Sequence, residues 1–237
     1  MSAIERLREA LDSQIDAALI VSDANRFYFT GFPSSAGTLL ITREQSYFIV
    51  DFRYIEIAKK TIQNCEVILQ GNLTEQLNEL IARHQVRTLG IEAATLSLAA
   101  YQRFAGTLNT QVLADSRLSD AIEAIRAIKT KEEQDALRSA QIMTDRAFSF
   151  IINHIHPGVT EQDIILNMGA FMERLGSEGR SFDFIAISGP KTSLPHGKAG
   201  TRVIERGDFV TMDFGCKVNG YLSDMTRTVA VGEVSTH

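Results

Sequence analysis

Hydrophobic and polar residues follow two different periods along the first half of the chain, and this pattern predicts an α/β domain. Apolar residues that recur every three or four positions predict helices at 3–12, 54–63, 72–84 and 96–108. Short β-branched, aromatic or continuously apolar stretches predict strands at 17–21, 26–30, 37–41, 46–50, 65–69, 88–91 and 111–114. Because strands and helices alternate, we expect a mixed sheet covered by helices.

The second half has longer periodic segments, which predict a separate domain. We place the boundary between residues 122 and 123. A long helix is expected over 132–154, and a second helix begins at a capping box in which Thr160 is the N-cap and Asp163 the third residue. Strand-like stretches follow at 181–188, 209–215 and 221–231.

The last two of these stretches are joined by Asn219-Gly220, the strongest short-range signal for a hairpin with a two-residue loop. With this loop, Asp213 lies opposite Thr226 and Gly215 lies opposite Asp224. Residues two apart on a strand share a face, so the two aspartates project from one face as diagonal neighbours, about 7–8 Å apart at Cβ. The glycine should leave space beside Asp224.

Two neighbouring carboxylates repel each other wherever water is partly excluded. Either one of them takes a proton or a cation lies between them. The expected separation suits a pair of divalent ions about 3.5–4 Å apart. From the spacing alone, a second interpretation stays open, in which Asp213 and Asp224 both face solvent on an exposed sheet.

Composition narrows the function classes. The 237 residues carry 24 basic and 29 acidic side chains, a net charge of −5 that argues against a nucleic-acid-binding protein. No stretch approaches the roughly 20 apolar residues of a membrane span, and the first residues are charged rather than apolar. Two isolated cysteines, Cys65 and Cys216, indicate no disulfide framework. We therefore expect a cytoplasmic protein without a membrane partner.

Several motifs in the same order resemble a known family. They are Asp23-Ala-Asn-Arg-Phe-Tyr-Phe-Thr-Gly31, Phe48-Ile-Val-Asp51, Ile185-Ala-Ile-Ser-Gly189-Pro, Leu194-Pro-His196-Gly197, Gly207-Asp208-Phe-Val-Thr-Met-Asp213-Phe-Gly215 and Tyr221-Leu-Ser-Asp224-Met-Thr-Arg-Thr228. The chain resembles the pita-bread metallopeptidases of family M24, in the branch of Xaa-Pro aminopeptidase and Xaa-Pro dipeptidase (prolidase). This implies a creatinase/prolidase-type α/β N-terminal domain over 1–122 and an incomplete α+β pita-bread domain over 123–237.

The resemblance also implies roles for three residues. Asp213 would be a terminal ligand of one metal ion, Asp224 would bridge two ions, and His196 would line the pocket and bind substrate or the tetrahedral intermediate. Two divalent ions are implied, with Mn²⁺ favoured and Co²⁺, Zn²⁺ or Fe²⁺ also compatible with the ligands. Metal-bound hydroxide would then cleave the Xaa-Pro bond of proline-containing peptides, and the complete protein would be a homodimer.

The sequence departs from this family after the hairpin. The resemblance implies three further ligands, a His and two Glu, that the chain does not contain, and we expect His237 to be a frayed end rather than a ligand. Two aspartates cannot hold two ions, so the chain should be inactive or bind metal very weakly. We favour a truncated sequence over a natural pseudoenzyme. A non-catalytic peptide- or protein-binding module on the same fold is the alternative.

Two smaller features have other interpretations. Ser188-Gly-Pro-Lys191 matches the S-x-x-K motif of a serine hydrolase, but neither S-D-N nor K-T-G occurs in the sequence, so we disfavour that class. His154 and His156 are two residues apart and would not share a helix face, so we expect surface or capping roles for them.

Overall fold

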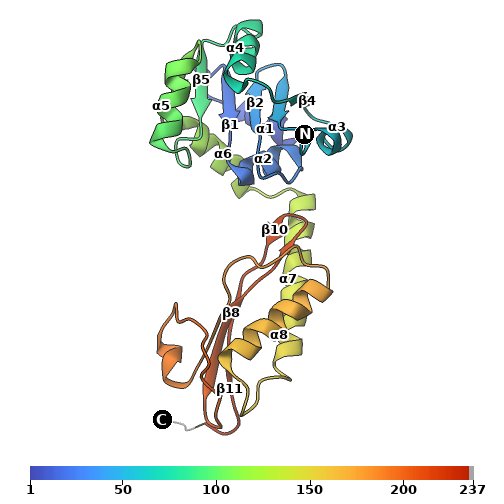
Figure 1. Cartoon of the computed structure of the whole chain (residues 1–237), viewed down its shortest axis with the longest axis vertical. Coiled ribbons are helices and arrows are strands. Elements are labelled where there is room, and N and C mark those ends of the chain that lie inside the picture. The colour runs from blue at the N-terminus through green and yellow to red at the C-terminus, as the bar shows by residue number, and fades with distance from the viewer. Residues whose placement is uncertain (235–237) are drawn as a thin grey trace. The chain divides into compact units, whose positions relative to one another are not determined.

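The computed structural model describes residues 1–234, and His237 lies outside them. The chain divides into an N-terminal unit, Met1–Ile128, and a C-terminal unit that begins at Lys129 (Figure 1). Helix α6 (Arg117–Ala127) lies in the N-terminal unit, because its residues Leu118 and Ile122 are buried in the N-terminal core and Ile125 packs against it. Within residues 1–234, no helix is both long and apolar enough to cross a membrane.

The N-terminal unit is built on a six-stranded mixed sheet in the order β4-β3-β2-β1-β5-β6. Its strands are β1 (Ala17–Ile20), β2 (Thr38–Thr42), β3 (Ser46–Val50), β4 (Glu66–Leu69), β5 (Thr88–Ile91) and β6 (Gln111–Leu113). Its other helices are α1 (Ala3–Ala10), α2 (Asp23–Thr30), α3 (Ile55–Thr61), α4 (Leu73–Arg83) and α5 (Leu98–Thr107). The pairs β1-β2 and β2-β3 are antiparallel, and β3-β4, β1-β5 and β5-β6 are parallel, which confirms the expected mixed sheet.

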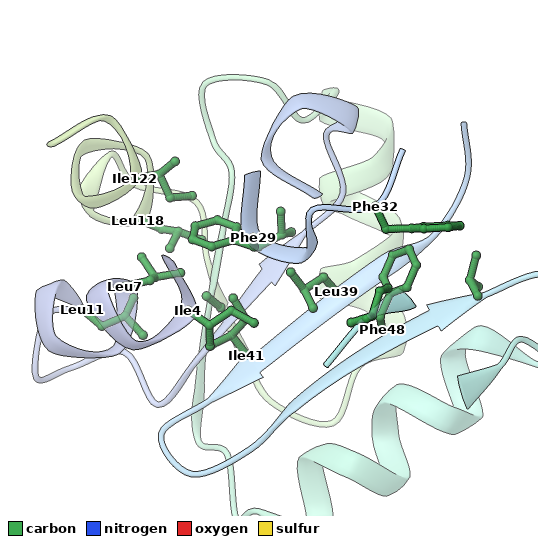
Figure 2. Packing of buried hydrophobic residues seen from close by; sticks show 14 of the residues in the cluster. Ile4, Leu7, Leu11, Phe29, Phe32, Leu39, Ile41, Phe48, Leu118 and Ile122 are labelled. Carbon is green, nitrogen blue, oxygen red and sulfur yellow. The ribbon is translucent and has the colours of Figure 1, made fainter. Parts of the chain in front are cut away.

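Helices cover both faces of this sheet. One apolar cluster joins α1, α2 and α6 to the strand residues Leu39, Ile41 and Phe48, as Figure 2 shows. A second cluster joins α4 and α5 to Leu40 and Ile49. Because neighbouring residues of a strand point to opposite faces, both sets of strand side chains are buried.

Helix α2 corrects one prediction, because residues 26–30 were expected to form a strand. The Ser22 hydroxyl caps the helix by accepting from the amide of Asn25, and Gly31 ends it with φ of 67°. Arg26, Phe29 and Thr30 are buried, which is the i, i+3, i+4 spacing of a helix face. The aromatic content suggested a strand, whereas the caps and this spacing determine a helix.

The C-terminal unit is a helix pair packed on a small antiparallel sheet. Its helices are α7 (Lys131–Ile151), α8 (Glu161–Arg174) and the short 3₁₀ helix η1 (Gly189–Ser193). Its strands are β7 (Ile185–Ser188), β8 (Phe209–Phe214), β9 (Lys217–Val218), β10 (Tyr221–Leu222) and β11 (Met225–Ala230). The sheet order is β11-β8-β7, and β9-β10 form a separate hairpin.

Helix α8 begins where the sequence indicated. The Thr160 side chain accepts from the Asp163 amide, and the Asp163 carboxylate accepts from the Thr160 amide, which confirms the predicted capping box. Two strand predictions were too long. The first strand begins only at Ile185, and the stretch 221–231 is divided into β10 and β11.

The sheet of this unit has one apolar and one polar face. Val210, Met212 and Phe214 of β8 are buried in the cluster that contains Met168 and Met172 of α8. The alternate β8 residues Thr211 and Asp213 are only half-buried. The second face is therefore where β8 can present polar groups.

Candidate metal and substrate site

The hairpin register predicted from Asn219-Gly220 is confirmed. Tyr221 pairs with Val218, and Thr226 pairs with Asp213 across β8 and β11. Asp213 is half-buried, Asp224 is exposed, and the Thr226 hydroxyl donates to Asp213 Oδ1 at 2.9 Å. The chain turns at Asn219 and Gly220 with φ of 50° and 78°, the left-handed conformation that a two-residue hairpin turn requires.

Ser223 and Asp224 form an irregular segment between β10 and β11. The Ser223 hydroxyl is buried and bonds to Thr144 Oγ1 of α7 at 2.6 Å and to the amide of Cys216 at 3.0 Å. The predicted open space at Gly215 was wrong, because a Cβ there would lie 2.0 Å from the Ser223 carbonyl oxygen. Gly215 thus allows two backbones to approach closely, and this approach anchors the residue before Asp224.

The charge of Asp213 affects the ionisation of Asp224. Partial loss of hydration, the charge of Asp213 and a hydrogen bond with the Asp213 carboxyl raise the pKa of Asp224 above its ordinary value. Two acidic groups held near each other have this electrostatic effect. Asp224 is exposed and Asp213 is half-buried, so the face that carries them is accessible to solvent. A shared cation would relieve the repulsion between two such charges.

The donor chemistry fits part of a metal site. Asp213 and Asp224 could supply two carboxylate ligands to a divalent ion. Within residues 1–234, however, no group of three or more His, Cys, Asp or Glu side chains is arranged to hold an ion. Since metal sites usually take at least three protein ligands, the pair by itself does not complete such a site.

His196 is exposed in a turn in which the Gly197 amide donates to the Leu194 carbonyl at 3.0 Å. A Cβ at Gly197 would lie 3.0 Å from Cγ2 of Ile187, so this glycine packs directly on β7. Ile187 pairs with Thr211, two residues before Asp213 on β8. Alternation along the strands therefore places the turn of His196 on the same sheet face as Asp213.

The S-x-x-K interpretation does not agree with the structure. Ser188 is 0 % exposed, its hydroxyl donates to Glu161, and it accepts a bond from Arg202. The Lys191 ammonium is bonded to Glu161 at 2.6 Å and not to Ser188. A nucleophile needs both access and an adjacent base, so these residues do not form a serine hydrolase site.

Sequence reasoning missed the polar residues that support the site. Glu161 was assigned to the first turn of α8, but its carboxylate is fully buried and bonded to Ser188, Lys191 and Gly200. His154 and His156 are exposed, as expected. Nδ1 of each imidazole bonds to a nearby backbone carbonyl.

An α/β domain followed by a helix-backed antiparallel sheet, whose polar face carries two neighbouring carboxylates, defines a two-domain protein. Residues 4–128 match the creatinase/prolidase N-terminal domain, and residues 135–237 match metallopeptidase family M24. The chain therefore belongs to metallopeptidase family M24, with a creatinase/prolidase N-terminal domain followed by part of a pita-bread domain. Membership in this family implies divalent metal cofactors.

Curated proteins and solved structures extend this likeness over nearly the whole chain. The uncharacterized peptidase YqhT of Bacillus subtilis is 36 % identical over 98 % of the chain and 66 % of its own length. The Xaa-Pro dipeptidase of Pyrococcus furiosus is 32 % identical over 97 % of the chain and 64 % of its own length. The structure of an Xaa-Pro dipeptidase from Bacillus anthracis is 38 % identical with a TM-score of 0.92, and the match covers 98 % of this chain and 65 % of that one. The chain thus spans slightly less than two thirds of these relatives.

Proposed function

We propose that this chain contributes Asp213, Asp224 and His196 to a metal-dependent exopeptidase that hydrolyses the Xaa-Pro bond at peptide N-termini or in dipeptides. The observation that carries the proposal is the interaction of the Asp213 and Asp224 carboxyls on the sheet face that also bears the turn of His196. Family membership and the likeness to Xaa-Pro dipeptidases support the reaction and the class of substrate.

Each residue has a distinct part in this proposal. Asp213 would be a terminal ligand and Asp224 a bridging ligand of a dinuclear site, with Mn²⁺ as the favoured ion. When bound, the ions would supply Lewis-acid activation of water and of the scissile carbonyl. His196, which is exposed on a turn and free of the strand ladder, would bind the substrate or the tetrahedral intermediate.

The described residues hold two of the donors that such a site requires. We therefore expect the 237-residue polypeptide by itself to bind Mn²⁺ weakly and to show no hydrolysis. Calorimetric titration with Mn²⁺ tests the first expectation, and an assay with an Xaa-Pro dipeptide tests the second. The alternative is a non-catalytic peptide- or protein-binding module. Calorimetric titration with a proline-containing peptide, without metal, would reveal it as metal-independent binding.

Activity is the main test, and it is measured in the full-length enzyme because the relatives are longer than this chain. Hydrolysis of an Xaa-Pro dipeptide and an Xaa-Pro-Xaa tripeptide is followed with added Mn²⁺ and after chelation. We expect Asp213→Asn or Asp224→Asn to lower kcat/KM more than about 100-fold, because even outer-shell partners of a metal cost 10–100-fold. Full activity in both variants would refute the proposal.

The imidazole of His196 needs its own control. We expect His196→Ala to lower kcat about 10²–10³-fold, the usual loss when one transition-state hydrogen bond is removed. His154→Ala is the matched control, because His154 is also exposed and bonds only to the Phe150 carbonyl among the contacts described for it. Equal activities of the two histidine variants would argue against a pocket role for His196.

We further infer a cytoplasmic homodimer without a nucleic-acid partner. The two free thiols and the net charge of −5 support the compartment and the exclusion of nucleic acid, and the creatinase-type N-terminal domain supports the dimer. Light scattering of the full-length enzyme tests the dimer, and a monomer at micromolar concentration would contradict it.

A further inference from the structure

A single buried carboxylate holds both ends of the segment that carries His196. Glu161 is the first residue of α8 and is 0 % exposed. Its Oε1 accepts from the amide of Ser188 at 2.9 Å and from the hydroxyl of Ser188 at 3.0 Å. Its Oε2 accepts from the amide of Gly200 at 2.9 Å. Ser188 and Gly200 flank the segment 189–199, so Glu161 closes this segment at its base.

The Lys191 side chain makes a further connection across the same segment. Its ammonium donates to Glu161 Oε2 at 2.6 Å and to the carbonyl of Lys198 at 2.9 Å. The lysine side chain is 33 % exposed, whereas its carboxylate partner is 0 % exposed. The Lys191 side chain therefore joins the first turn of the segment to its second half. The turn Leu194–Gly197, which contains His196, lies between Lys191 and Lys198.

The segment passes around the edge strand β7 of the described sheet. Ser188 pairs with Val210, whose side chain lies on the apolar face that packs against the helices, and Glu161 reaches Ser188 from α8. Gly197 instead packs on Ile187, whose side chain lies on the opposite face together with Asp213. The base of the segment is thus held on the helical side, while its tip lies on the side of the candidate site.

We call the contacts of the Glu161 carboxylate with Ser188, Lys191 and Gly200 the clamp. The chemistry of Glu161 suits contacts that are permanent. Burial alone would raise the pKa of this carboxyl, but the hydrogen bonds from Lys191, Gly200 and Ser188 outweigh it and lower the pKa below the ordinary value. The group is therefore ionised at neutral pH, and every polar contact described for it uses that charge. With no exposed surface, the carboxylate cannot touch a peptide substrate.

From these contacts we propose that Glu161 is a positioning residue, whose carboxylate fixes the segment 189–199 and thereby places His196 over the sheet face that bears Asp213. The catalytic meaning of that placement rests on the proposed function, whereas the clamp itself does not. The Ser188 hydroxyl also has a second partner. Arg202 bonds to Ser188 Oγ at 2.7 Å and is itself held by Asp208 at 2.6 Å. Loss of Glu161 should therefore loosen the segment without unfolding the sheet.

Hydrogen exchange of the 237-residue chain, read by mass spectrometry, tests the clamp directly. In Glu161→Gln, the amides of 189–200 should exchange at least about tenfold faster, because Gly200 and Lys191 lose a charged acceptor. Lys191→Met should give a smaller increase in the same peptides. Protection of β8 should not change in either variant.

Matched controls separate the clamp from general destabilisation. Glu173→Gln removes an exposed carboxylate from the same helix, and Lys198→Met removes an exposed ammonium from the same segment, so neither should alter exchange in 189–200. Unchanged exchange in Glu161→Gln, or an equal rise across α8 and β8, would overturn the proposal. Should Glu161→Gln fail to fold, Lys191→Met decides by the same comparison, since its side chain is partly exposed.

A double-mutant cycle in the full-length enzyme tests whether the clamp acts through His196. The losses in kcat from Glu161→Gln and His196→Ala should be strongly non-additive, so that the double variant is no slower than His196→Ala alone. Lys191→Arg should restore most of the rate lost in Lys191→Met. Fully additive losses would overturn positioning through His196. If His196→Ala itself has no effect, the proposed role of His196 fails, and the exchange experiment alone judges the clamp.

Discussion

The two sheets of this chain use the alternation of strand side chains in opposite ways. In the N-terminal unit, all residues of β1, β2 and β3 are buried, because helices cover both faces. In the C-terminal unit, every second residue of β8 is buried and the residues between them are at least partly exposed. The central strands of the first sheet therefore have no face left for chemistry, while the second sheet presents Thr211, Asp213 and Thr226 on one face.

Buried carboxylates show the same contrast. Glu92 in the N-terminal unit is 1 % exposed and accepts from the amides of Val21 and Ser22 at the start of α2. Its hydrogen bonds stay within the core and stabilise a helix N-terminus. Glu161 in the C-terminal unit is equally buried, but it holds a segment whose tip is exposed. Comparable chemistry thus supports a closed core in one unit and a polar surface in the other.

The largest expected effects are in the N-terminal sheet. Phe48 and Ile49 are adjacent residues of β3, both 0 % exposed, and they belong to the clusters on opposite faces. Because each truncation leaves a cavity, Phe48→Ala should cost about 3–5 kcal/mol and Ile49→Ala about 2–5 kcal/mol in free energy of unfolding. Urea unfolding followed by labelling of the half-buried thiol of Cys65 reports on this unit.

The contrast between the two sheets would be contradicted if Phe48→Ala or Ile49→Ala left the chain as stable as the wild type. Cys216 is the matched reporter, since it is 0 % exposed and lies in the core of the other unit. Its urea midpoint should be less affected than that of Cys65 in both variants. Peptides containing the two cysteines are separated by mass spectrometry, so one experiment measures both units.

Adjacent residues of β8 should differ sharply from each other. Met212 is 0 % exposed and packs in the helix-backed cluster, so Met212→Ala should cost about 2–5 kcal/mol. Thr211→Ala should cost less than about 1 kcal/mol, because its hydroxyl bonds to Thr228 on the other, exposed face. The urea dependence of Cys216 labelling measures both losses. Similar losses at the two positions would show that the second face is as closed as the first.

Local patterns in the sequence were sufficient for the hairpin and for the start of α8. The Asn219-Gly220 dipeptide fixes a left-handed turn, and a period of two then determines which residues lie opposite each other, so the pairing of Asp213 with Thr226 followed directly. The capping box of Thr160 and Asp163 is likewise a contact between neighbours in sequence.

Features that depend on distant residues could not be predicted in this way. Glu161 bonds to partners 27, 30 and 39 residues away, and no local period connects such positions. At Gly215, the prediction of free space failed because the close approach of the Ser223 carbonyl arises from tertiary packing against Thr144. In α2, aromatic content masked the weaker signals of Ser22 and Gly31, which form caps at the two helix ends.

A smaller effect than that of Met212→Ala is expected for the ion pair of Arg202 and Asp208, which lies beside the clamp of the C-terminal unit. Hydrogen bonds from Arg202, together with the amide of Glu205 and in opposition to burial, lower the pKa of Asp208 below its ordinary value of 3.8. A carboxyl with a lowered folded pKa stabilises the protein above that ordinary value and loses this contribution as the pH falls through the folded pKa. Asp208→Asn should therefore cost about 1–3 kcal/mol near neutral pH.

The same substitution should cost progressively less below pH 3.8, because the wild-type carboxyl is then being protonated as well. Urea unfolding followed by circular dichroism, for wild type and variant at neutral pH and at about pH 2.5, measures this convergence. Glu205→Gln is the matched control, since its carboxylate is 76 % exposed and 3.8 Å from Arg202, and it should change stability by less than about 0.5 kcal/mol. A cost for Asp208→Asn that stays constant over this pH range would mean that Asp208 stabilises the unit through packing rather than through its charge. The contribution of Asp208 to stability would then be as insensitive to pH as that of the apolar clusters in the N-terminal unit.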